Sequence, residues 1–549
     1  MTATPATAQR LGGHTVIETL AALGARVAFG VPGVHALAMW DALRTSELRA
    51  FGTRTELCAA FAADGYARSS GRPAPLLLST GPGALNSLTG LMEAARAHVP
   101  VVAISSQIPR ELLGTHRGYL HKLDGQLASF APIVKHAARA ESVEAIPEMV
   151  VEAWSVAQTP PSGPAYLEIP VDVLRAEAGP IPTLTPSGNP RAFRAASPGA
   201  TAEAVTLLAG AENPVIWAGG GVLRSGARSE LRALAERLDA PVITTFMGKG
   251  AIDEAHPLAV GSGCDEAAVL ELLGDADVVL AVGTELGADT TNQYGLRFGG
   301  SLIHLDAAPE RIGVSYPALP LVGDARATLA ALLPALPQAR SAGAERTAKV
   351  RERIAAGLAD QSREDELALM AAVERALGPD AVTTWDMTIL AYWAAAHLRL
   401  RAGQQFHYPL GSGTLGYAWP AALGVAAAAA EGEGEGPHRK VLAVSGDGGL
   451  AYGLAEMATA RQQAVDATLL VVDDGGYGIL REYQRADYDE TTAVDLVQPD
   501  LVRTAEAFGL PVRGGGIETA EENLRWTLAI DGPAVVVVKA RLASALPTP

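Results

Sequence analysis

Short apolar runs that end at glycine and acidic residues recur along this chain. Residues 441–444 form one such run, followed by Gly-Asp-Gly, and residues 469–472 form another, followed by Asp-Asp-Gly-Gly. Runs of this length bounded by turn residues predict two buried strands. The intervening residues 454–464 have helical composition and contain neither Gly nor Pro. Strand, helix and strand in this order predict a βαβ crossover, in which the two strands are parallel.

The same alternation extends over the rest of the sequence and predicts an α/β fold. Further strands are predicted at residues 27–30, 76–78 and 101–104, and in four apolar segments, PVIWAGGGV, PVITT, ADVVLAVGTEL and SLIHLDAAP. A Pro-rich stretch at residues 179–198 is typical of a linker, and residues 431–440, EGEGEGPHRK, of a surface loop. We therefore expect three doubly wound parallel-sheet domains, the central one Rossmann-like, at residues 1–178, 199–337 and 365–549.

Composition narrows the possible partners and the compartment. The chain has 549 residues, of which 48% are hydrophobic, and a net charge of −17, so it can form large cores and should not bind nucleic acid or anionic membranes non-specifically. Its two cysteines are too few for a disulfide framework. The start, MTATPATAQRLGGHTV, lacks the basic and apolar regions of a signal peptide. These features predict a cytoplasmic protein.

The two predicted strands of the crossover each deliver a carboxylate to the same edge of a sheet. Asp447 and Asp474 follow the apolar runs and lie 27 positions apart. Ligands of parallel α/β sheets bind beyond the carboxyl ends of the strands, where glycines let the backbone approach an anion. Carboxylate oxygens suit Mg²⁺, so the pattern predicts a Mg²⁺-bound diphosphate here. The alternative for Gly-Asp-Gly alone is an acidic turn after a strand.

The spacing resembles the diphosphate motif of thiamine-diphosphate enzymes, in which Gly-Asp-Gly is followed at about this interval by two Asn. The resemblance implies that Asp447, Asp474 and the carbonyl of Gly476 bind the metal ion. This sequence departs from the pattern, because Asp473 and Asp474 stand where Asn-Asn is usual. The extra negative charge beside the diphosphate predicts an altered metal preference or affinity.

A second stretch carries a resemblance in the N-terminal domain. Arg-Thr-Glu at residues 54–56 is followed by AAFAADGYAR, by Thr-Gly-Pro-Gly at 80–83 and by Asn86. This order is similar to the pyrimidine-binding domain of the acetolactate synthase group of thiamine-diphosphate enzymes. The resemblance implies that Glu56 bonds a pyrimidine ring nitrogen and activates the cofactor by proton exchange. A carboxylate that only interacts with its helix dipole is the alternative for this residue.

The resemblance also implies the remaining members of the site. Leu415 stands where the family places the apolar residue that bends the cofactor, although an ordinary core leucine is the alternative. The full set of expected cofactor-binding residues is Thr80, Gly81, Pro82, Gly83, Asn86, Thr388, Gly411, Ser412, Gly413, Leu415, Gly446, Gly448, Gly449, Tyr477 and Gly478. The expected substrate-facing residues are Gln107, His116 and Leu480.

The sequence of the central domain does not decide whether this domain binds a nucleotide. Its glycines at 219–221 follow a predicted strand, but Arg224 stands where a dinucleotide fingerprint needs glycine. Members of the family bind FAD, ADP or nothing in this domain. The broken pattern disfavours a flavin or nicotinamide oxidoreductase, which is one alternative function.

The resemblance implies non-oxidative decarboxylation of a 2-oxo acid, with protonation of the enamine or its transfer to a second carbonyl. A decarboxylase specialised for another substrate, such as a guanidino 2-oxo acid, is the runner-up, since RGYLHKLDG resembles such enzymes over a short stretch. A catalytically silent homologue is a third possibility, which Glu56 and Asp447 disfavour. In this family Glu56 and Asp447 would meet only between subunits, so a homodimer or homotetramer is expected.

Overall fold

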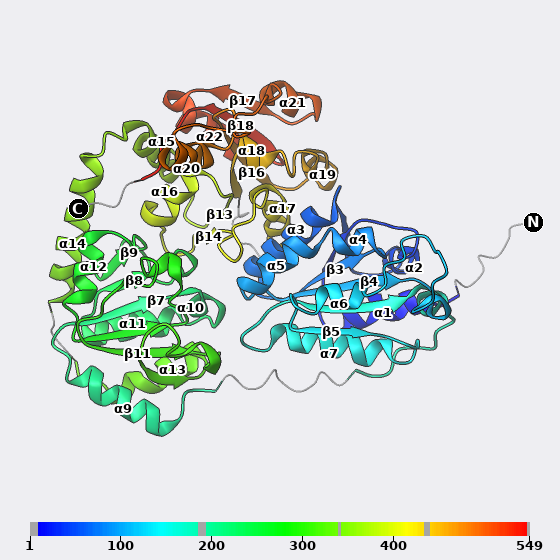
Figure 1. The fold of residues 1–549 in the computed structure, drawn as a ribbon, viewed down its shortest axis with the longest axis horizontal. Helices are drawn as coiled ribbons and strands as arrows, with labels where there is room; N and C mark the ends of the chain where they lie inside the picture. The colour runs from blue at the N-terminus through cyan, green and yellow to red at the C-terminus, as the bar shows by residue number, and fades with distance from the viewer. Residues whose placement is uncertain (1–8, 185–193, 339–341, 433–439, 546–549) are drawn as a thin grey trace, which may run out of the picture. The chain divides into compact units, whose positions relative to one another are not determined.

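Three six-stranded parallel sheets, each flanked by helices, make up the computed structural model of this chain (Figure 1). The structure describes residues 9–184, 194–338, 342–432 and 440–545. The predicted α/β class with three parallel-sheet domains is confirmed. Most of the predicted surface loop at 431–440, and the middle of the predicted linker, lie outside the described residues.

The first sheet has the strand order β2-β1-β3-β4-β6-β5. Its strands are β1 (Val27–Gly30), β2 (Arg49–Gly52), β3 (Ala74–Leu78), β4 (Val101–Gln107), β5 (His136–Arg139) and β6 (Ala165–Pro170). Helices α1 (Gly12–Ala22), α2 (Leu37–Leu43) and α7 (Ile146–Gln158) share the core on one face. Helix α3 (Glu56–Ser70) packs on β1 and β3 and against α5 (Leu88–Arg96). The strands predicted at 27–30, 76–78 and 101–104 are therefore confirmed.

Helix α3 is buried by a segment from the far end of the sequence. Helix α17 (Ala418–Ala429) packs along it, and residues 409–432 and 452–467 belong to the same compact unit as the N-terminal domain. A Cβ atom on Gly65 would lie 2.2 Å from the carbonyl oxygen of Ala421, and one on Gly424 would lie 1.8 Å from that of Ala62. Glycine on both helices is what allows their backbones to come this close.

The second sheet has the order β12-β11-β10-β7-β8-β9. Its strands are β7 (Pro214–Ala218), β8 (Val242–Thr244), β9 (Ala259–Gly261), β10 (Val278–Val282), β11 (Ser301–Asp306) and β12 (Leu319–Val322). The four predicted apolar segments are its four central strands. Helices α11 (Arg228–Leu238) and α13 (Ala325–Leu332) share one core cluster, and α12 (Ala267–Gly274) and α14 (Gly343–Ala359) contribute to another.

The third sheet carries the carboxylates singled out by the sequence, and its order is β14-β13-β15-β16-β18-β17. Its strands are β13 (Val382–Trp385), β14 (Gln405–His407), β15 (Val441–Gly446), β16 (Ala467–Asp473), β17 (Val512–Gly515) and β18 (Ala534–Lys539). Helix α19 (Glu456–Gln463) lies between β15 and β16 in the chain, as predicted. Because β15 and β16 are neighbours, the residues that follow them meet at one edge of the sheet.

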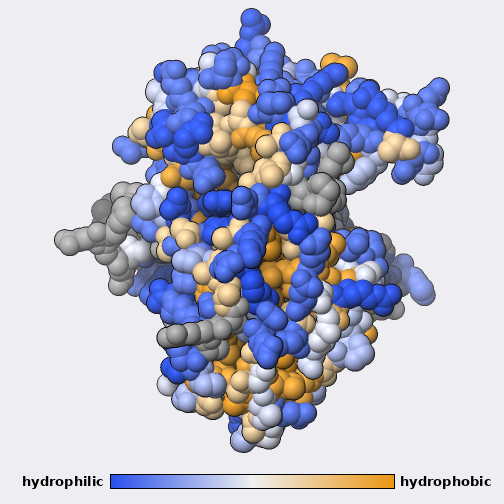
Figure 2. Space-filling model, turned by 90° about the vertical axis from the view of Figure 1, so that its left-hand side faces the viewer, coloured by the Kyte–Doolittle hydropathy of each residue, from blue (hydrophilic) through white to orange (hydrophobic). Residues whose placement is uncertain are grey.

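The surface carries both polar and apolar side chains (Figure 2). The face drawn in Figure 2 is mostly polar, with apolar residues gathered in patches between polar ones. Among the helices that the structure describes, none is long and apolar enough to cross a membrane.

Candidate active site

Asp447 lies where β15 gives way to helix α18 (Asp447–Leu450). The apolar residues of β15 are buried in the sheet, so the chain can turn only at the glycines that follow them. The Asp447 side chain is 2% exposed, and both of its carboxylate oxygens are buried without a hydrogen bond from the described residues. A buried, unpaired carboxylate is costly unless a cation or another donor satisfies it.

Asp474 follows β16 and faces Asp447. Its Oδ1 accepts a hydrogen bond of 3.0 Å from the backbone N–H of Gly476, and its Oδ2 lies 3.6 Å from Nη1 of Arg481. Burial, followed by the charges of Asp474 and Asp473, raises the pKa of Asp447 to about 6. Burial also raises the pKa of Asp474, an effect that the Arg481 charge opposes. The two carboxylates repel each other here, and a divalent cation between them would relieve that repulsion.

Three glycines lie beside these carboxylates, at positions that have no room for a side chain. A Cβ atom on Gly448 would lie 2.8 Å from ring atoms of Tyr477, and one on Gly478 would lie 2.1 Å from Oδ2 of Asp474. A Cβ atom on Gly449 would lie 2.6 Å from Oδ2 of the buried Asp386. Side chains are thus excluded from the rim of the site, as close approach to a diphosphate requires.

Thr388 belongs to the same cluster. It is the N-cap of helix α16 (Ile389–His397), and its hydroxyl would lie 3.1 Å from a Cβ atom on Gly446. The structure therefore brings together the predicted residues that follow β13, β15 and β16. The described residues contain no group of three or more His, Cys, Asp and Glu side chains placed to hold a metal ion. A cation at Asp447 and Asp474 would take its other ligands from carbonyl, phosphate or water oxygens.

Glu56 occupies the first turn of α3, where the N-cap Thr55 accepts a 3.2 Å hydrogen bond from the Cys58 N–H. Its carboxylate is partly exposed, and Oε2 accepts a 3.2 Å hydrogen bond from Nδ2 of Asn86. A Cβ atom on Gly83 would lie 3.1 Å from Oε1. Glu56, Gly83 and Asn86, which the sequence grouped together, thus lie together in the structure. The Asn86 amide orients the Glu56 carboxylate, and Gly83 lies beside it without a side chain.

Hydrogen bonds to buried side chains hold the turn that precedes Gly83. Gly81 adopts φ of +61°, and its N–H donates a 2.7 Å hydrogen bond to Oε1 of the buried Gln126. Pro82 begins helix α4 (Pro82–Leu85), and the Thr80 hydroxyl lies 2.9 Å from that of Ser106. These contacts hold the turn rigidly at the carboxyl end of β3.

The predicted substrate-facing residues lie in different environments. Gln107 is fully buried, where its amide donates to Glu168 at 3.2 Å and accepts from the N–H of Ile108 at 2.7 Å. His116 is exposed, and Leu480, on helix α20 (Gly478–Tyr488), is 44% exposed. Gln107 therefore contributes to a buried polar cluster, whereas the other two are accessible.

The Gly-rich loop at 411–416 binds a carboxylate of the N-terminal domain. The N–H groups of Gly411 and Ser412 donate to the buried Glu93 at 3.0 and 2.7 Å. These two donors belong to residues predicted to bind the cofactor, and in this structure they bind a side chain. Gly413 has φ of +68°, and Leu415 is only partly buried, which distinguishes it from an ordinary core leucine.

The residues that bind this loop were not predicted from the sequence. Glu93 also binds Arg68 at 3.1 Å, and Arg68 binds Asp64 at 2.6 Å, which in turn accepts a 2.6 Å hydrogen bond from the Tyr417 hydroxyl. All are buried. Because Glu93 and Asp64 lie more than 300 positions from the residues of the loop segment that they bind, no local pattern could have identified them.

A second group missed by the sequence is a pair of imidazoles beside Gly81, of which His35 is buried and His121 partly buried. The rings of His35 and His121 lie 5.4 Å apart, Tyr119 stacks on His35 at 5.7 Å, and a Cβ atom on Gly81 would lie 2.3 Å from the His121 carbonyl oxygen. Burial, then His121 and Arg175, lowers the pKa of His35. No role was predicted for His121, and no sequence pattern singled out His35.

The glycines of the central domain are explained by backbone packing. Cβ atoms on Gly219 and Gly221 would lie 2.3 and 2.6 Å from backbone atoms of Gly283, at the end of β10. The guanidinium of Arg224 lies over Gly220, where a Cβ atom would be 2.7 Å from Nη1. Arg224, which stands where a dinucleotide fingerprint needs glycine, therefore covers the glycine turn after β7.

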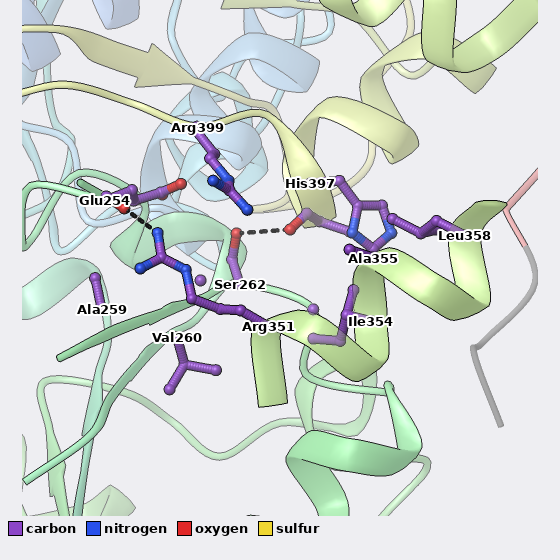
Figure 3. Close-up of a pocket in the computed structure, with 13 residues that line it drawn as sticks. Glu254, Ala259, Val260, Ser262, Arg351, Ile354, Ala355, Leu358, His397 and Arg399 are labelled. Carbon is purple, nitrogen blue, oxygen red and sulfur yellow. Dashed lines mark hydrogen bonds between the residues drawn. The ribbon is translucent and has the colours of Figure 1, made fainter. Parts of the chain in front are cut away.

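A separate pocket lies at the junction of β9, α14 and the end of α16 (Figure 3). Arg351 lines it, but its guanidinium donates to the carbonyls of Glu254 and His256. His397 lies 3.4 Å from Glu266, and burial, followed by the Lys249 charge, lowers its pKa to about 4. None of the predicted site residues lines this pocket, and its Arg351 and His397 side chains join segments of the chain.

Paired acids that follow neighbouring strands of one α/β domain, and a glutamate beside a glycine in another, are the features in which this chain resembles thiamine-diphosphate enzymes. Three family models agree with this class: the thiamine pyrophosphate enzyme N-terminal TPP binding domain matches residues 10–128, the central domain 201–332 and the C-terminal TPP binding domain 386–538.

Whole-chain relatives specify the family further. A Pseudomonas aeruginosa protein named "Probable 2-ketoarginine decarboxylase" is 36% identical over 534 residues, which cover 96% of this chain and 93% of that protein. A "Probable acetolactate synthase large subunit" of Methanocaldococcus jannaschii is 31% identical over 562 residues, 98% of this chain and 93% of that protein. An acetolactate synthase of Arthrospira platensis is 31% identical over 544 residues, covering 91% and 88%. The chain belongs to the acetolactate synthase and 2-oxo-acid decarboxylase family of thiamine-diphosphate enzymes, as the sequence predicted.

Proposed function

We propose that this protein is a thiamine-diphosphate- and Mg²⁺-dependent enzyme that decarboxylates a 2-oxo acid and then releases or transfers the remaining acyl unit. The observation that carries the proposal is the meeting of Asp447 and Asp474 after adjacent strands, in the domain that matches the C-terminal TPP binding model. Both oxygens of Asp447 are buried and unpaired among the described residues, as suits ligands awaiting a cation.

The residues of the site have the oxygen ligands and the small side chains that this cofactor and its metal ion need. Asp447, Asp474 and the carbonyl of Gly476 would hold Mg²⁺, while the glycine rim admits the diphosphate. Bound thiamine diphosphate supplies an electron sink for the charge left when CO₂ departs. Glu56 would hold a proton at a pyrimidine ring nitrogen, and Asn86 would keep its carboxylate oriented. Leu415 would support the bent cofactor from its partly buried position.

We further propose that the active site is shared between subunits of a homodimer or homotetramer, with Glu56 from one and Asp447 from the other. Co-expression of Glu56→Gln and Asp447→Asn chains with different tags tests this arrangement. A shared site leaves one of the two sites in the mixed dimer free of substitutions, so the purified mixed dimer should retain about half of the wild-type turnover. A site built within one chain would leave the mixed dimer inactive.

The relatives support two substrate choices. Similarity to acetolactate synthases supports carboligation between two 2-oxo acids, and the 36% identity to a protein named for 2-ketoarginine supports decarboxylation of that guanidino acid. The test is CO₂ release from pyruvate, other 2-oxo acids and 2-ketoarginine, with and without a second carbonyl compound, followed by product analysis. Release from none of them, in the presence of thiamine diphosphate and Mg²⁺, would refute the proposed function.

A further inference from the structure

The site holds more negative charge than its family pattern provides. Asp474 stands at the position of a neutral Asn, and Asp473 and Asp447 lie close enough for their charges to interact. A diphosphate brought to this place adds further negative charge. Some group of this chain must offset the extra carboxylate if the site is to bind an anion.

Arg481 is placed to do so. It comes from the first turn of α20, and its side chain is only 7% exposed. Nη1 lies 3.6 Å from Oδ2 of Asp474, while Nε donates a 2.9 Å hydrogen bond to Oδ1 of Asp495. Asp495 itself is 65% exposed, so water already stabilises much of its charge. The guanidinium thus lies between two carboxylates, and its charge opposes the burial that raises the pKa of the more buried Asp474, as the charge of Arg541 also does.

One end of this guanidinium remains available. Among the described residues, Nη2 of Arg481 is buried without a hydrogen-bond partner, and it would lie 2.8 Å from a Cβ atom on Gly476. Gly476 supplies the carbonyl expected to bind the metal ion. Its turn is held in place because the N–H of Tyr477 donates to Val494 at 2.8 Å and that of Leu496 donates to Gly475 at 2.9 Å. The unpaired donor thus lies beside the metal-binding turn.

We propose that Arg481 is a positioning residue that compensates the charge of Asp474, so that the pair together replaces the neutral amide usual at this place. The inference rests on the proposed function, because it concerns affinity for Mg²⁺ and thiamine diphosphate. A planar guanidinium suits the role, since it stays charged when buried and can bind a carboxylate and a phosphate at once.

A double-mutant cycle tests the coupling between Arg481 and Asp474. The variants are Arg481→Met, Asp474→Asn and the double substitution. The exposed Arg503, which pairs with Asp500 at 3.6 Å, provides the matched control Arg503→Met. Dissociation constants for thiamine diphosphate at fixed Mg²⁺, and for Mg²⁺ at saturating thiamine diphosphate, are measured by tryptophan fluorescence and calorimetry, without reference to turnover.

We expect Arg481→Met to weaken binding by about tenfold or more, and the same substitution to have an effect of about twofold or less in the Asp474→Asn background. The control should bind as the wild type does. Equal losses in both backgrounds would overturn the proposal, because a purely structural role through Asp495 does not depend on the charge at 474. If Arg481→Met does not fold, Arg481→Gln takes its place in the same cycle: a loss of affinity that shrinks in the Asp474→Asn background supports charge compensation, and equal losses in both backgrounds overturn it.

The two proposals fail differently. A wild-type protein that binds no thiamine diphosphate with Mg²⁺ would refute the proposed function together with this inference. Tight binding by the wild type without coupling between the two positions would refute the inference alone.

Discussion

Glu56→Gln separates a catalytic carboxylate from a structural one more cleanly than any other substitution in this chain. Glutamine has the same length, and its amide oxygen can still accept the 3.2 Å hydrogen bond from Asn86. Thr55 continues to cap α3 through the Cys58 N–H. What the variant loses is the negative charge and the ability to exchange a proton.

The loss of the charge affects stability, and the loss of proton exchange affects turnover, by different amounts. A charge in the first turn of a partly exposed helix contributes about 0.3–1 kcal/mol to stability, so the variant should stay folded. Positioned proton transfer contributes about 10²–10⁴-fold to rate, equivalent to about 3–5 kcal/mol of activation free energy. Turnover should therefore fall by at least about a hundredfold while thermal stability changes little.

The assay is CO₂ release by purified protein saturated with thiamine diphosphate and Mg²⁺, with unfolding followed in parallel. Glu148→Gln is the matched control, since Glu148 lies in the first turn of α7, on the other side of the same domain. It should show the small stability loss alone. If Glu56→Gln kept more than about a tenth of wild-type turnover, the assignment of Glu56 as the activating residue would be wrong.

Three other expectations concern charges and thiols away from the cofactor. His397 has its pKa lowered to about 4 from an ordinary value near 6.5, so the folded protein binds fewer protons than the unfolded chain and loses stability as the pH falls from about 6.5 to 4. His397→Gln should lessen that loss in urea unfolding at a series of pH values. Arg68→Met leaves two buried carboxylates without their cation and should cost about 3–5 kcal/mol of unfolding free energy, whereas an effect below about 1 kcal/mol would contradict the burial of this network. Burial raises the pKa of both Cys58 and Cys264, the latter to about 12, so neither thiol should react with Ellman's reagent at pH 8 until the protein is denatured.

The sequence predicted those parts of the site that depend on strand ends. Asp447 and Asp474 could be placed together because parallel strands terminate at one edge of a sheet. Glu56 and Asn86 could be grouped only through the resemblance to the pyrimidine-binding domain, because α3 and β3 separate them along the chain. Their roles toward a cofactor stay predictions, for which the variants above provide the tests.

Other features had no local signal. In the second sheet the apolar runs marked the four central strands, whereas the edge strands β9 and β12 are short and less buried. Glu93 binds a loop 318 positions away, so only tertiary structure reveals it. Arg481 could have been suspected, because an Asp in place of Asn calls for a nearby cation and the following helix offers one seven residues later.

The close crossing of α3 and α17 limits how this chain can be divided. Residues 1–191 expressed alone would expose the apolar side of α3 that α17 covers, and such a fragment should aggregate. Chimeras between relatives would need to exchange the N-terminal domain together with the segments around Ala421 and Glu456, since a bulkier residue opposite Gly65 or Gly424 from a mismatched parent would push the two helices apart.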